Sequence, residues 1–168
     1  MMKKIKLLSL FLLVTMFACG QKTPKSPRLQ AEGKIQGVTV AVDYGAPSVR
    51  ERTIWGGLEK YGKVWRAGAN ENTTVSFDQD VKIDGKALKA GKYGFFIIPN
   101  ESGDWVVIFN SKNDAWGSGS YKEEEDVLRV NIKPSFVDEN QEQLKYDVSS
   151  KSIDFAWEKA RLTITVSK

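Results

Sequence analysis

No histidine occurs among the 168 residues, and cysteine occurs only once, as Cys19. The lack of histidine excludes Ser-His-Asp and Cys-His triads, histidine-ligated zinc and the commonest general base near neutral pH. A single cysteine excludes an intrachain disulfide. Stability must therefore come from an apolar core, and the chain is long enough to build one.

Motifs for phosphates, metals and cofactors are also missing. The glycine- and serine-rich run at residues 117–120 lacks the lysine and the following helix of a phosphate-binding loop. The acidic run at residues 123–126 lacks the alternating ligands and glycine turn of a calcium loop. The carboxylates form no marked pair of the kind that glycoside hydrolases use. We therefore predict no metal and no cofactor, and the chemistry argues against an enzyme without deciding the question.

The first 18 residues have the pattern of a secretory signal. Three lysines among the first six residues precede an apolar run. The run is shorter than the roughly 20 apolar residues of a membrane-spanning helix. Residues 16–20 (MFACG) resemble a bacterial lipobox, which implies cleavage before Cys19 and its lipidation. The alternative is a plain secretory signal with an incidental cysteine.

Acyl chains on Cys19 would hold the protein on a membrane. The two residues that follow, Gly20 and Gln21, include neither an aspartate that resembles an inner-membrane retention signal nor an acidic pair that resembles a surface-export signal. We therefore expect a cell-envelope protein, an outer-membrane lipoprotein that faces the periplasm, with the membrane as its first partner.

Removal of the signal changes the charge. The whole chain has 25 Lys and Arg against 21 Asp and Glu, a net charge of +4 and a pI of about 9.1. Without the three lysines of residues 1–18, 22 basic residues face 21 acidic ones. Nucleic-acid binding needs a concentrated basic surface, so we predict no nucleic-acid partner.

Beyond the signal, the chain divides into a tether and one domain. Residues 19–32 are polar, contain two prolines and lack periodicity, which predicts a lipidated Cys19 followed by a flexible tether. Residues 33–168 contain short apolar runs of period two, separated by turn residues such as Asp84-Gly85. About nine strands result, near residues 38–44, 75–77, 81–83, 94–98, 105–109, 128–132, 144–148, 153–157 and 162–166. We predict one all-β domain, an antiparallel β-sandwich or jelly roll.

The longest stretch without a strand pattern, residues 44–74, holds most of the candidate binding residues. Loops of this length in compact domains are often functional. Arginine forks bind carboxylates and phosphates, and tryptophan faces stack on rings and cations. The candidates here are Tyr44, Arg50, Arg52, Trp65, Arg66, Asn70 and Glu71. The alternative is structural: Trp65 would plug the end of the sandwich, and Arg66 would pair with Glu71.

Two further candidates, Trp116 and Tyr121, lie in a polar loop after a predicted buried strand. Trp116 would be either a stacking platform for a ligand or a lid over the core. Four other aromatic residues follow the strand period and are assigned to the core: Trp105, Phe109, Phe155 and Trp157.

Long motifs in the chain resemble one known family. These are YGAPSVRERTIWGGL at residues 44–58 and YGKVWRAGANE at residues 61–71, with AGKY at 90–93, WG at 116–117 and AWEK at 156–159. They resemble the bacterial domain of unknown function 2911 family, roughly over residues 33–168. The resemblance implies an all-β fold and a secreted or lipid-anchored protein of Bacteroidetes-like bacteria, and it implies no known activity.

Three functions stay open. The first is a non-enzymatic binding module whose long loop and Trp116 loop form a site for a small anionic, glycan or peptide ligand. The second is a structural or assembly protein of the cell envelope that uses a face of the sandwich against another protein. The third is a carboxylate-dependent hydrolase with Glu71 as its base. Convergence of Arg50, Arg66, Asn70, Glu71 and Trp116 on one open pocket would favour the first. Burial and mutual pairing of these side chains would favour a structural role instead.

Overall fold

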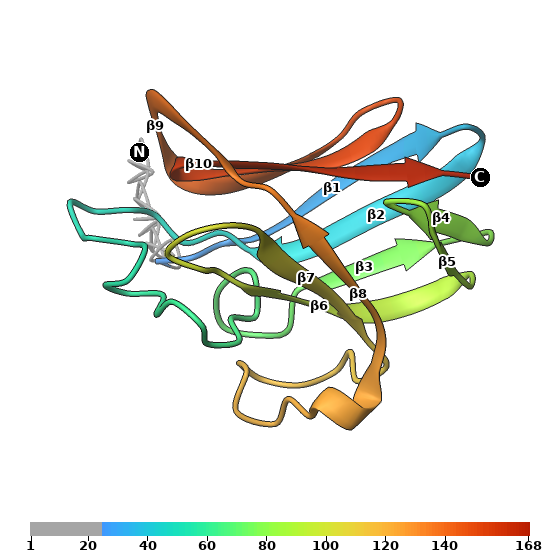
Figure 1. The fold of residues 1–168 in the computed structure, drawn as a ribbon, viewed down its shortest axis with the longest axis horizontal. Helices are drawn as coiled ribbons and strands as arrows, with labels where there is room; N and C mark the ends of the chain where they lie inside the picture. Colours follow the sequence, from blue (N-terminus) through green and yellow to red (C-terminus); the bar gives the residue numbers. More distant parts are fainter. Residues whose placement is uncertain (1–24) are drawn as a thin grey trace, which may run out of the picture.

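The computed structural model describes residues 25–168, which form two antiparallel β-sheets packed face to face (Figure 1). The large sheet has six strands in the order β1-β2-β3-β6-β7-β8, and the small sheet has four in the order β5-β4-β10-β9. The strands are β1 (Arg28–Ile35), β2 (Val38–Gly45), β3 (Thr74–Phe77), β4 (Val81–Ile83), β5 (Lys86–Leu88), β6 (Gly91–Ile98), β7 (Trp105–Asn110), β8 (Asp126–Ile132), β9 (Ser135–Val148) and β10 (Ser152–Ser167), with one 3₁₀ turn, η1 (Glu123–Glu125). The predicted all-β antiparallel sandwich is confirmed. The predicted signal peptide and Cys19 lie outside the described residues.

In the large sheet, the period-two pattern of the sequence becomes a buried face. Val38, Val40 and Val42 of β2 are at most 1% exposed, whereas the residues between them are partly exposed. The turn that joins β1 to β2 is Gln36-Gly37, and both residues have positive φ, 50° and 86°. This is the geometry of a type I′ hairpin, whose twist matches that of the flanking strands.

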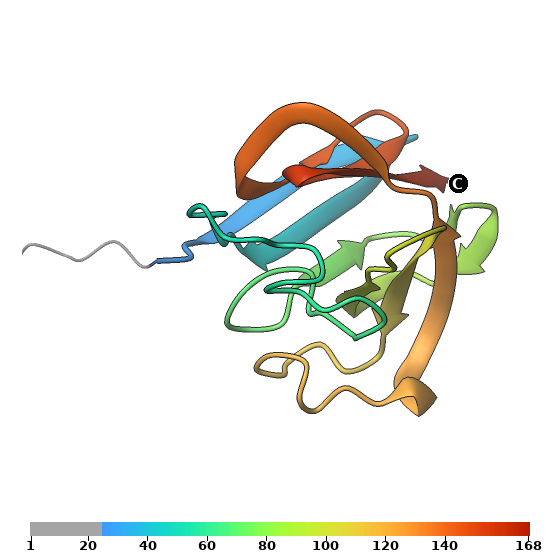
Figure 2. The same ribbon diagram turned by 60° about the vertical axis from the view of Figure 1, so that its left-hand side comes forward.

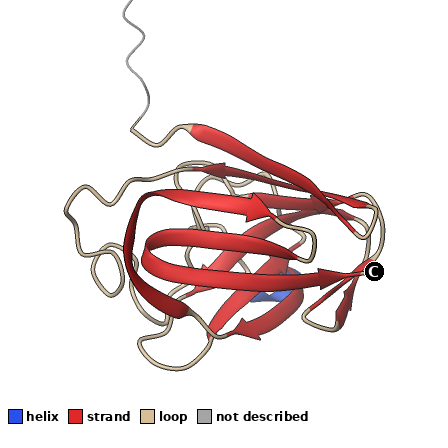
Figure 3. Cartoon of the chain, turned by 90° about the horizontal axis from the view of Figure 1, so that it is seen from above, coloured by secondary structure: helices blue, strands red, loops and turns tan. Residues whose placement is uncertain are grey.

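In the small sheet, β10 folds back on itself (Figure 3). Glu158 has a φ of 51°, and the pairing of β10 with β9 shifts register on both sides of it. The amide of Val166 donates to the carbonyl of Lys151 at 2.9 Å, so the beginning and end of β10 lie side by side. Phe155 and Leu162 therefore reach the same buried face from opposite arms of one strand.

Four tryptophans fill one end of the core. Trp105 and Trp157 come from β7 and β10, and both are fully buried. Trp55 and Trp65 come from residues 46–73, the connection between β2 and β3, and pack against them with ring centroids 4.5 Å (Trp55–Trp105) and 5.4 Å (Trp65–Trp157) apart. Such aromatic pairs fasten the long connection to the sandwich. The predicted core positions of Trp105, Phe109, Phe155 and Trp157 are confirmed.

The boundary between tether and domain needs a correction. The sequence pattern places the domain start at residue 33, but β1 begins at Arg28, so residues 28–32 belong to the sheet. β1 is an edge strand on which only Ile35 is buried, and it therefore lacks the apolar alternation that marks a strand in sequence. The pattern also misses β5, because only Leu88 of its three residues is buried.

Candidate functional site

The connection of residues 46–73 crosses the end of the sandwich and is fixed at both of its borders. Near its start it pairs with β9: the amide of Val49 donates to the carbonyl of Glu142 at 2.7 Å. Near its end the amide of Ala69 donates to the carbonyl of Gly45 at 3.1 Å. Gly45 has to be glycine here, because a Cβ would collide with the carbonyl oxygen of Ala69. Figure 2 shows this connection on the same side of the molecule as the start of β1.

Three of the predicted arginines, Arg50, Arg52 and Arg66, line one pocket in this connection. We call it the arginine pocket, and its volume is about 250 Å³. The full lining is Lys25, Ser26, Pro47, Ser48, Arg50, Arg52, Leu58, Glu59, Arg66, Gly68 and Ala69. The structure thus brings together three guanidinium groups that are distant in sequence. The outermost two, those of Arg50 and Arg66, are 16 residues apart.

The three arginines differ in which of their N–H donors already form hydrogen bonds within the described residues. Arg52 donates from Nε to the carbonyl of Val49 at 3.0 Å and from its NH2 group to the carbonyl of Ser48 at 2.6 Å. Arg50 donates from its NH2 group to the carbonyl of Lys25 at 2.6 Å. The Nε of Arg66 is buried and has no hydrogen-bond partner. An unpaired buried donor is costly, and Arg66 is the one of the three arginines with such a donor within residues 25–168.

Glu59 is the acidic residue of the arginine pocket. Burial raises the pKa of its carboxyl from 4.5 to about 7, although the positive charges of Arg66 and Arg52 partly oppose that rise. Within the described residues, no ion pair of 4.0 Å or less joins Glu59 to either arginine. Near neutral pH the protonated form of this carboxyl is therefore populated, and in that form the pocket carries the charge of its cations alone.

Glu71 and Trp116 line a second and separate pocket, which we call the Trp116 groove. Its volume is about 270 Å³. Its lining residues are Arg28, Glu71, Asn72, Thr74, Lys92, Asn113, Asp114, Ala115 and Trp116. The side chain of Trp116 is 69% exposed, so it does not cover the core. The predicted pairing of Arg66 with Glu71 does not form in the structure, because the two side chains line different pockets.

Asn70 lies between the two pockets. Its Nδ2 donates to the carbonyl of Ser26 at 3.4 Å, and its carbonyl accepts the amide of Gly117 at 3.0 Å. These bonds tie the start of the described chain and the Trp116 loop to the connection. Asn70 therefore positions both pockets and lines neither.

The remaining three candidates, Tyr44, Trp65 and Tyr121, lie apart from both pockets. Tyr44 and Trp65 are 3% exposed, and the Nε1 of Trp65 donates to the carbonyl of Gly68 at 3.0 Å. Trp65 occupies the plug position of the structural alternative. Tyr121 donates from its hydroxyl to Asp126 at 2.6 Å. Burial, followed by that bond to Asp126, raises the pKa of Tyr121 far above its ordinary value, so it stays a neutral hydroxyl.

Sequence reasoning does not identify Glu59 or Arg28. Glu59 stands between Leu58 and Lys60 in a polar segment, with no periodicity to indicate that its side chain is half-buried. Arg28 lies in the segment predicted as a tether, yet it is an ion-pair partner of Asp43 and donates to the carbonyl of Asn72 at 2.9 Å. Both positions depend on tertiary contacts that no local pattern encodes.

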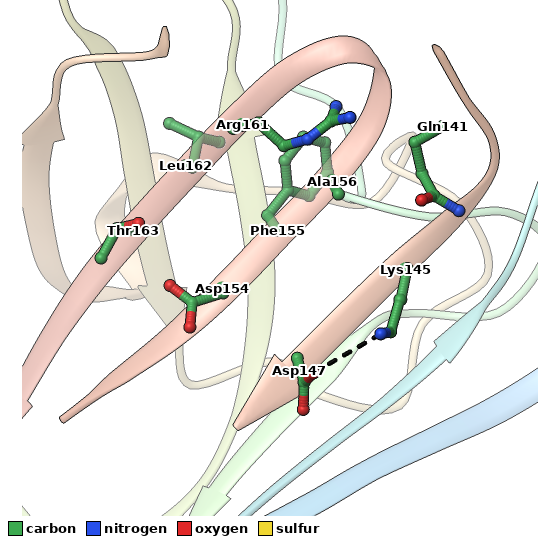
Figure 4. A pocket seen from close by; sticks show the side chains of 9 residues that line it. All are labelled: Gln141, Lys145, Asp147, Asp154, Phe155, Ala156, Arg161, Leu162 and Thr163. Atoms are coloured by element: carbon green, nitrogen blue, oxygen red, sulfur yellow. Dashed lines mark ion pairs between the residues drawn. The ribbon is translucent and has the colours of Figure 1, made fainter. Parts of the chain in front are cut away.

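A third and larger concavity, about 340 Å³, lies on the outer face of β9 and β10 (Figure 4). Its charged groups already have partners. Lys145 and Asp147 form an ion pair at 3.5 Å, and Arg161 donates to three backbone carbonyls, those of Glu158, Ala160 and Glu139. The charged groups of this face therefore bond mainly to one another and to the backbone.

Two further findings apply to residues 25–168. This part of the chain contains no group of three or more Cys, Asp or Glu side chains arranged to hold a metal ion. Within the same residues, no helix combines the length and apolar character needed to cross a membrane.

Fold and pockets together define a class of protein: an antiparallel two-sheet β-sandwich with a cationic pocket and an aromatic groove built from the loops at one end. Residues 26–166 match the family described as "Protein of unknown function (DUF2911)", and the chain belongs to that family. The resemblance seen in the sequence motifs is thereby confirmed. No curated protein and no solved structure is significantly similar to the chain.

Proposed function

We propose that this protein is a non-enzymatic binding module whose arginine pocket takes a small ligand that carries a carboxylate or phosphate group. One observation carries the proposal: Arg50, Arg52 and Arg66 line a single pocket in which the only acidic side chain is Glu59. Guanidinium forks match carboxylate and phosphate oxygens in shape and charge. Pockets that gather cations in this way attract anions.

The hydrogen bonding of Arg66 supports this proposal. Its buried Nε has no partner among residues 25–168. A bound anion would satisfy this donor with a charge-assisted hydrogen bond, worth roughly 1.5–3 kcal/mol. The other arginines are held by backbone carbonyls, so their guanidinium groups are in place before a ligand binds. Such preorganisation lowers the entropic cost of binding.

Backbone strain at the arginine pocket also supports the proposed anion site. Arg50 and Glu51 are consecutive non-glycine residues with positive φ, 50° and 58°. Left-handed conformations cost such residues roughly 1–2 kcal/mol each. Strain of this kind persists where the surrounding structure imposes it, often at ligand sites. Here the strained turn carries the guanidinium of Arg50 to the rim of the pocket.

The proposal includes a place in the cell, as a lipoprotein of the outer membrane that faces the periplasm. Lys25 and Ser26 form part of the pocket wall. If Cys19 carries the lipid, the six Cα–Cα steps from Cys19 to Lys25 span at most about 20 Å. The arginine pocket would then lie close to the membrane surface, where phosphate-bearing molecules are abundant.

Calorimetry with two simple anions tests the binding proposal. Inorganic sulfate represents a tetrahedral phosphate-like group and succinate represents a carboxylate ligand. We expect the purified protein to bind at least one of them, and Arg66→Gln to weaken that binding about tenfold or more, the loss expected for one charge-assisted hydrogen bond. The melting temperature should stay unchanged, because Arg66 Nε has no protein partner to lose.

Lys63→Gln is the matched control. Lys63 is an exposed cation of the same connection that does not line the pocket. Its replacement removes one positive charge and should leave the affinity nearly unchanged. Equal losses of anion affinity in Lys63→Gln and Arg66→Gln would show that the loss reflects the overall charge and not the pocket. Unfolding of Arg66→Gln would assign that arginine a structural role.

A further inference from the structure

We propose that the Trp116 groove is a second binding site, separate from the arginine pocket, and that its ligand is a saccharide. The starting observation is the exposure of Trp116. At 69% it is the most exposed large apolar side chain of the described residues, whereas the other four tryptophans are at most 9% exposed. A single exposed apolar residue is common on protein surfaces, so the case for a site depends on the polar groove that surrounds Trp116.

The exposed position of Trp116 is built into the fold. On either side of Trp116 the backbone pairs with the connection: the amide of Asn72 donates to the carbonyl of Ala115 at 2.9 Å, and the amide of Gly117 donates to the carbonyl of Asn70 at 3.0 Å. Trp116 itself forms a β-bridge with Glu71. The indole is therefore held on a fixed backbone. A ligand that stacks on it binds with little entropic cost for ordering the loop.

The groups around Trp116 suit a neutral polyol better than an ion. The groove contains two cations, Arg28 and Lys92, and two carboxylates, Glu71 and Asp114, together with the amide of Asn113. The lining thus contains donors and acceptors without an excess of one sign, although Arg28 also pairs with Asp43 and Asp114 with Lys112. Sugar hydroxyls both donate and accept, and charged partners strengthen such bonds.

A buried and incompletely bonded amide belongs to the lining of the same groove. Asn72 lines the groove, is 2% exposed and donates from Nδ2 to the carbonyl of Lys112 at 3.1 Å, while its Oδ1 has no partner. Buried polar atoms are nearly always hydrogen-bonded, so an unpaired acceptor at a pocket wall is a feature that a ligand hydroxyl can satisfy.

The volume of the Trp116 groove and the geometry of stacking on an indole also fit a saccharide. The groove volume of about 270 Å³ is small, slightly below the roughly 300 Å³ at which pockets for drug-sized ligands begin. One pyranose ring fits such a volume while the rest of an oligosaccharide extends outside. The C–H face of a pyranose is apolar and can pack on the negative face of an indole ring, while its hydroxyls point sideways toward the polar wall.

The test uses three neutral hexasaccharides as probes: cellohexaose, maltohexaose and the hexamer of N-acetylglucosamine. We expect calorimetry to detect binding of at least one probe to the purified protein. Acrylamide quenching of tryptophan fluorescence should decrease on binding, since Trp116 is the accessible tryptophan. Trp116→Ala should weaken binding at least tenfold without lowering the melting temperature, and Trp116→Phe should keep part of the affinity.

Arg66→Gln separates this proposal from the arginine pocket. The variant should bind the saccharide as the wild type does, and Trp116→Ala should bind sulfate as the wild type does. The proposal is overturned if no probe binds at millimolar concentration or if Trp116→Ala binds the probe normally. Self-association that Trp116→Ala abolishes would also overturn it, because the indole would then serve a protein contact.

Discussion

Glu59 shows at the scale of one residue how the arginine pocket balances its charges. Burial raises the pKa of its carboxyl from 4.5 to about 7, so the folded protein holds a proton that the unfolded chain releases at lower pH. The folded state binds more protons than the unfolded state between these two values, and stability therefore falls as pH rises from about 4.5 to about 7.

We expect Glu59→Gln to remove this pH dependence. In urea unfolding, the wild type should lose on the order of 2–3 kcal/mol between pH 4.5 and pH 8, the cost of ionising a carboxyl with such a raised pKa. The variant should match the wild type near pH 4.5 and exceed it at pH 8. Glu101→Gln, at an exposed carboxyl in the β6–β7 turn, should follow the wild type throughout. A flat wild-type profile would contradict the assigned burial of Glu59.

The same carboxyl should control anion affinity. Sulfate keeps its charge from pH 5.5 to 8.5, whereas Glu59 gains a negative charge over that range. We therefore expect sulfate to bind more weakly at the higher pH, and Glu59→Gln to bind it equally at both. Calorimetry at the two values measures the difference. A wild-type affinity that does not change with pH would mean that Glu59 lies outside the influence of the bound anion.

Backbone strain at Glu51 gives a second prediction for a single residue. Glu51 is exposed and has a φ of 58°. Glycine adopts this conformation without steric cost, so Glu51→Gly should unfold at higher urea concentration than Glu51→Ala, by about 1 kcal/mol. Both variants lose the same charge, and their comparison isolates the backbone. Equal stability of the two variants would show that the turn is not strained in solution.

At the scale of elements, β10 illustrates what the sequence predicts well. Buried apolar residues of β10 fall on odd positions up to Trp157 and on even positions from Ala160. This change of phase separates two predicted runs, and in the structure it coincides with the reversal at Glu158. The sequence predicts the two arms because each has a buried face. It does not predict that they form one strand, since pairing with β9 is a long-range contact.

Gly94 tests how β6 supports the Trp116 loop. A Cβ at this position would collide with the carbonyl oxygen of Lys112 and crowd the side chain of Asn72. We expect Gly94→Ala to destabilise the protein by about 1–3 kcal/mol, the usual cost of overpacking a buried site. The displaced loop should also change acrylamide quenching of Trp116. Gly119→Ala is the control, because a Cβ there meets open space, and similar losses in both variants would refute the proposed contact.

For the whole molecule, the two pockets are formed by segments distant in sequence. The binding residues predicted from the sequence include the three arginines of one pocket and Trp116 and Glu71 of the other. They are predicted because arginine, tryptophan and glutamate side chains are types that commonly contact ligands. The predicted residues also include Tyr44, which continues the buried alternation of β2 and lies in the core. The division into two pockets depends on the backbone pairing of Asn70 with Gly117, and a sequence pattern does not encode such a contact.

The expected membrane anchor is also a property of the whole chain. If Cys19 is lipidated, the wild type should sediment with membranes and resist extraction by high salt, because acyl chains are held by hydrophobic burial. Cys19→Ser should appear in the soluble envelope fraction. Immunoblots of the separated fractions measure the distribution, and a wild type found entirely in the soluble fraction would contradict the anchor.

The most direct measurement for the central claim is an NMR titration of the arginine Nε–H signals with inorganic sulfate. We predict that the signal of Arg66 moves most, since its Nε has no partner in the part of the chain that the structure describes, and that Arg50 and Arg52 respond at the same sulfate concentration. Arg129 and Arg161, which lie away from the pocket, should not respond. Saturable shifts at Arg129 or Arg161 with none at Arg66 would contradict the account.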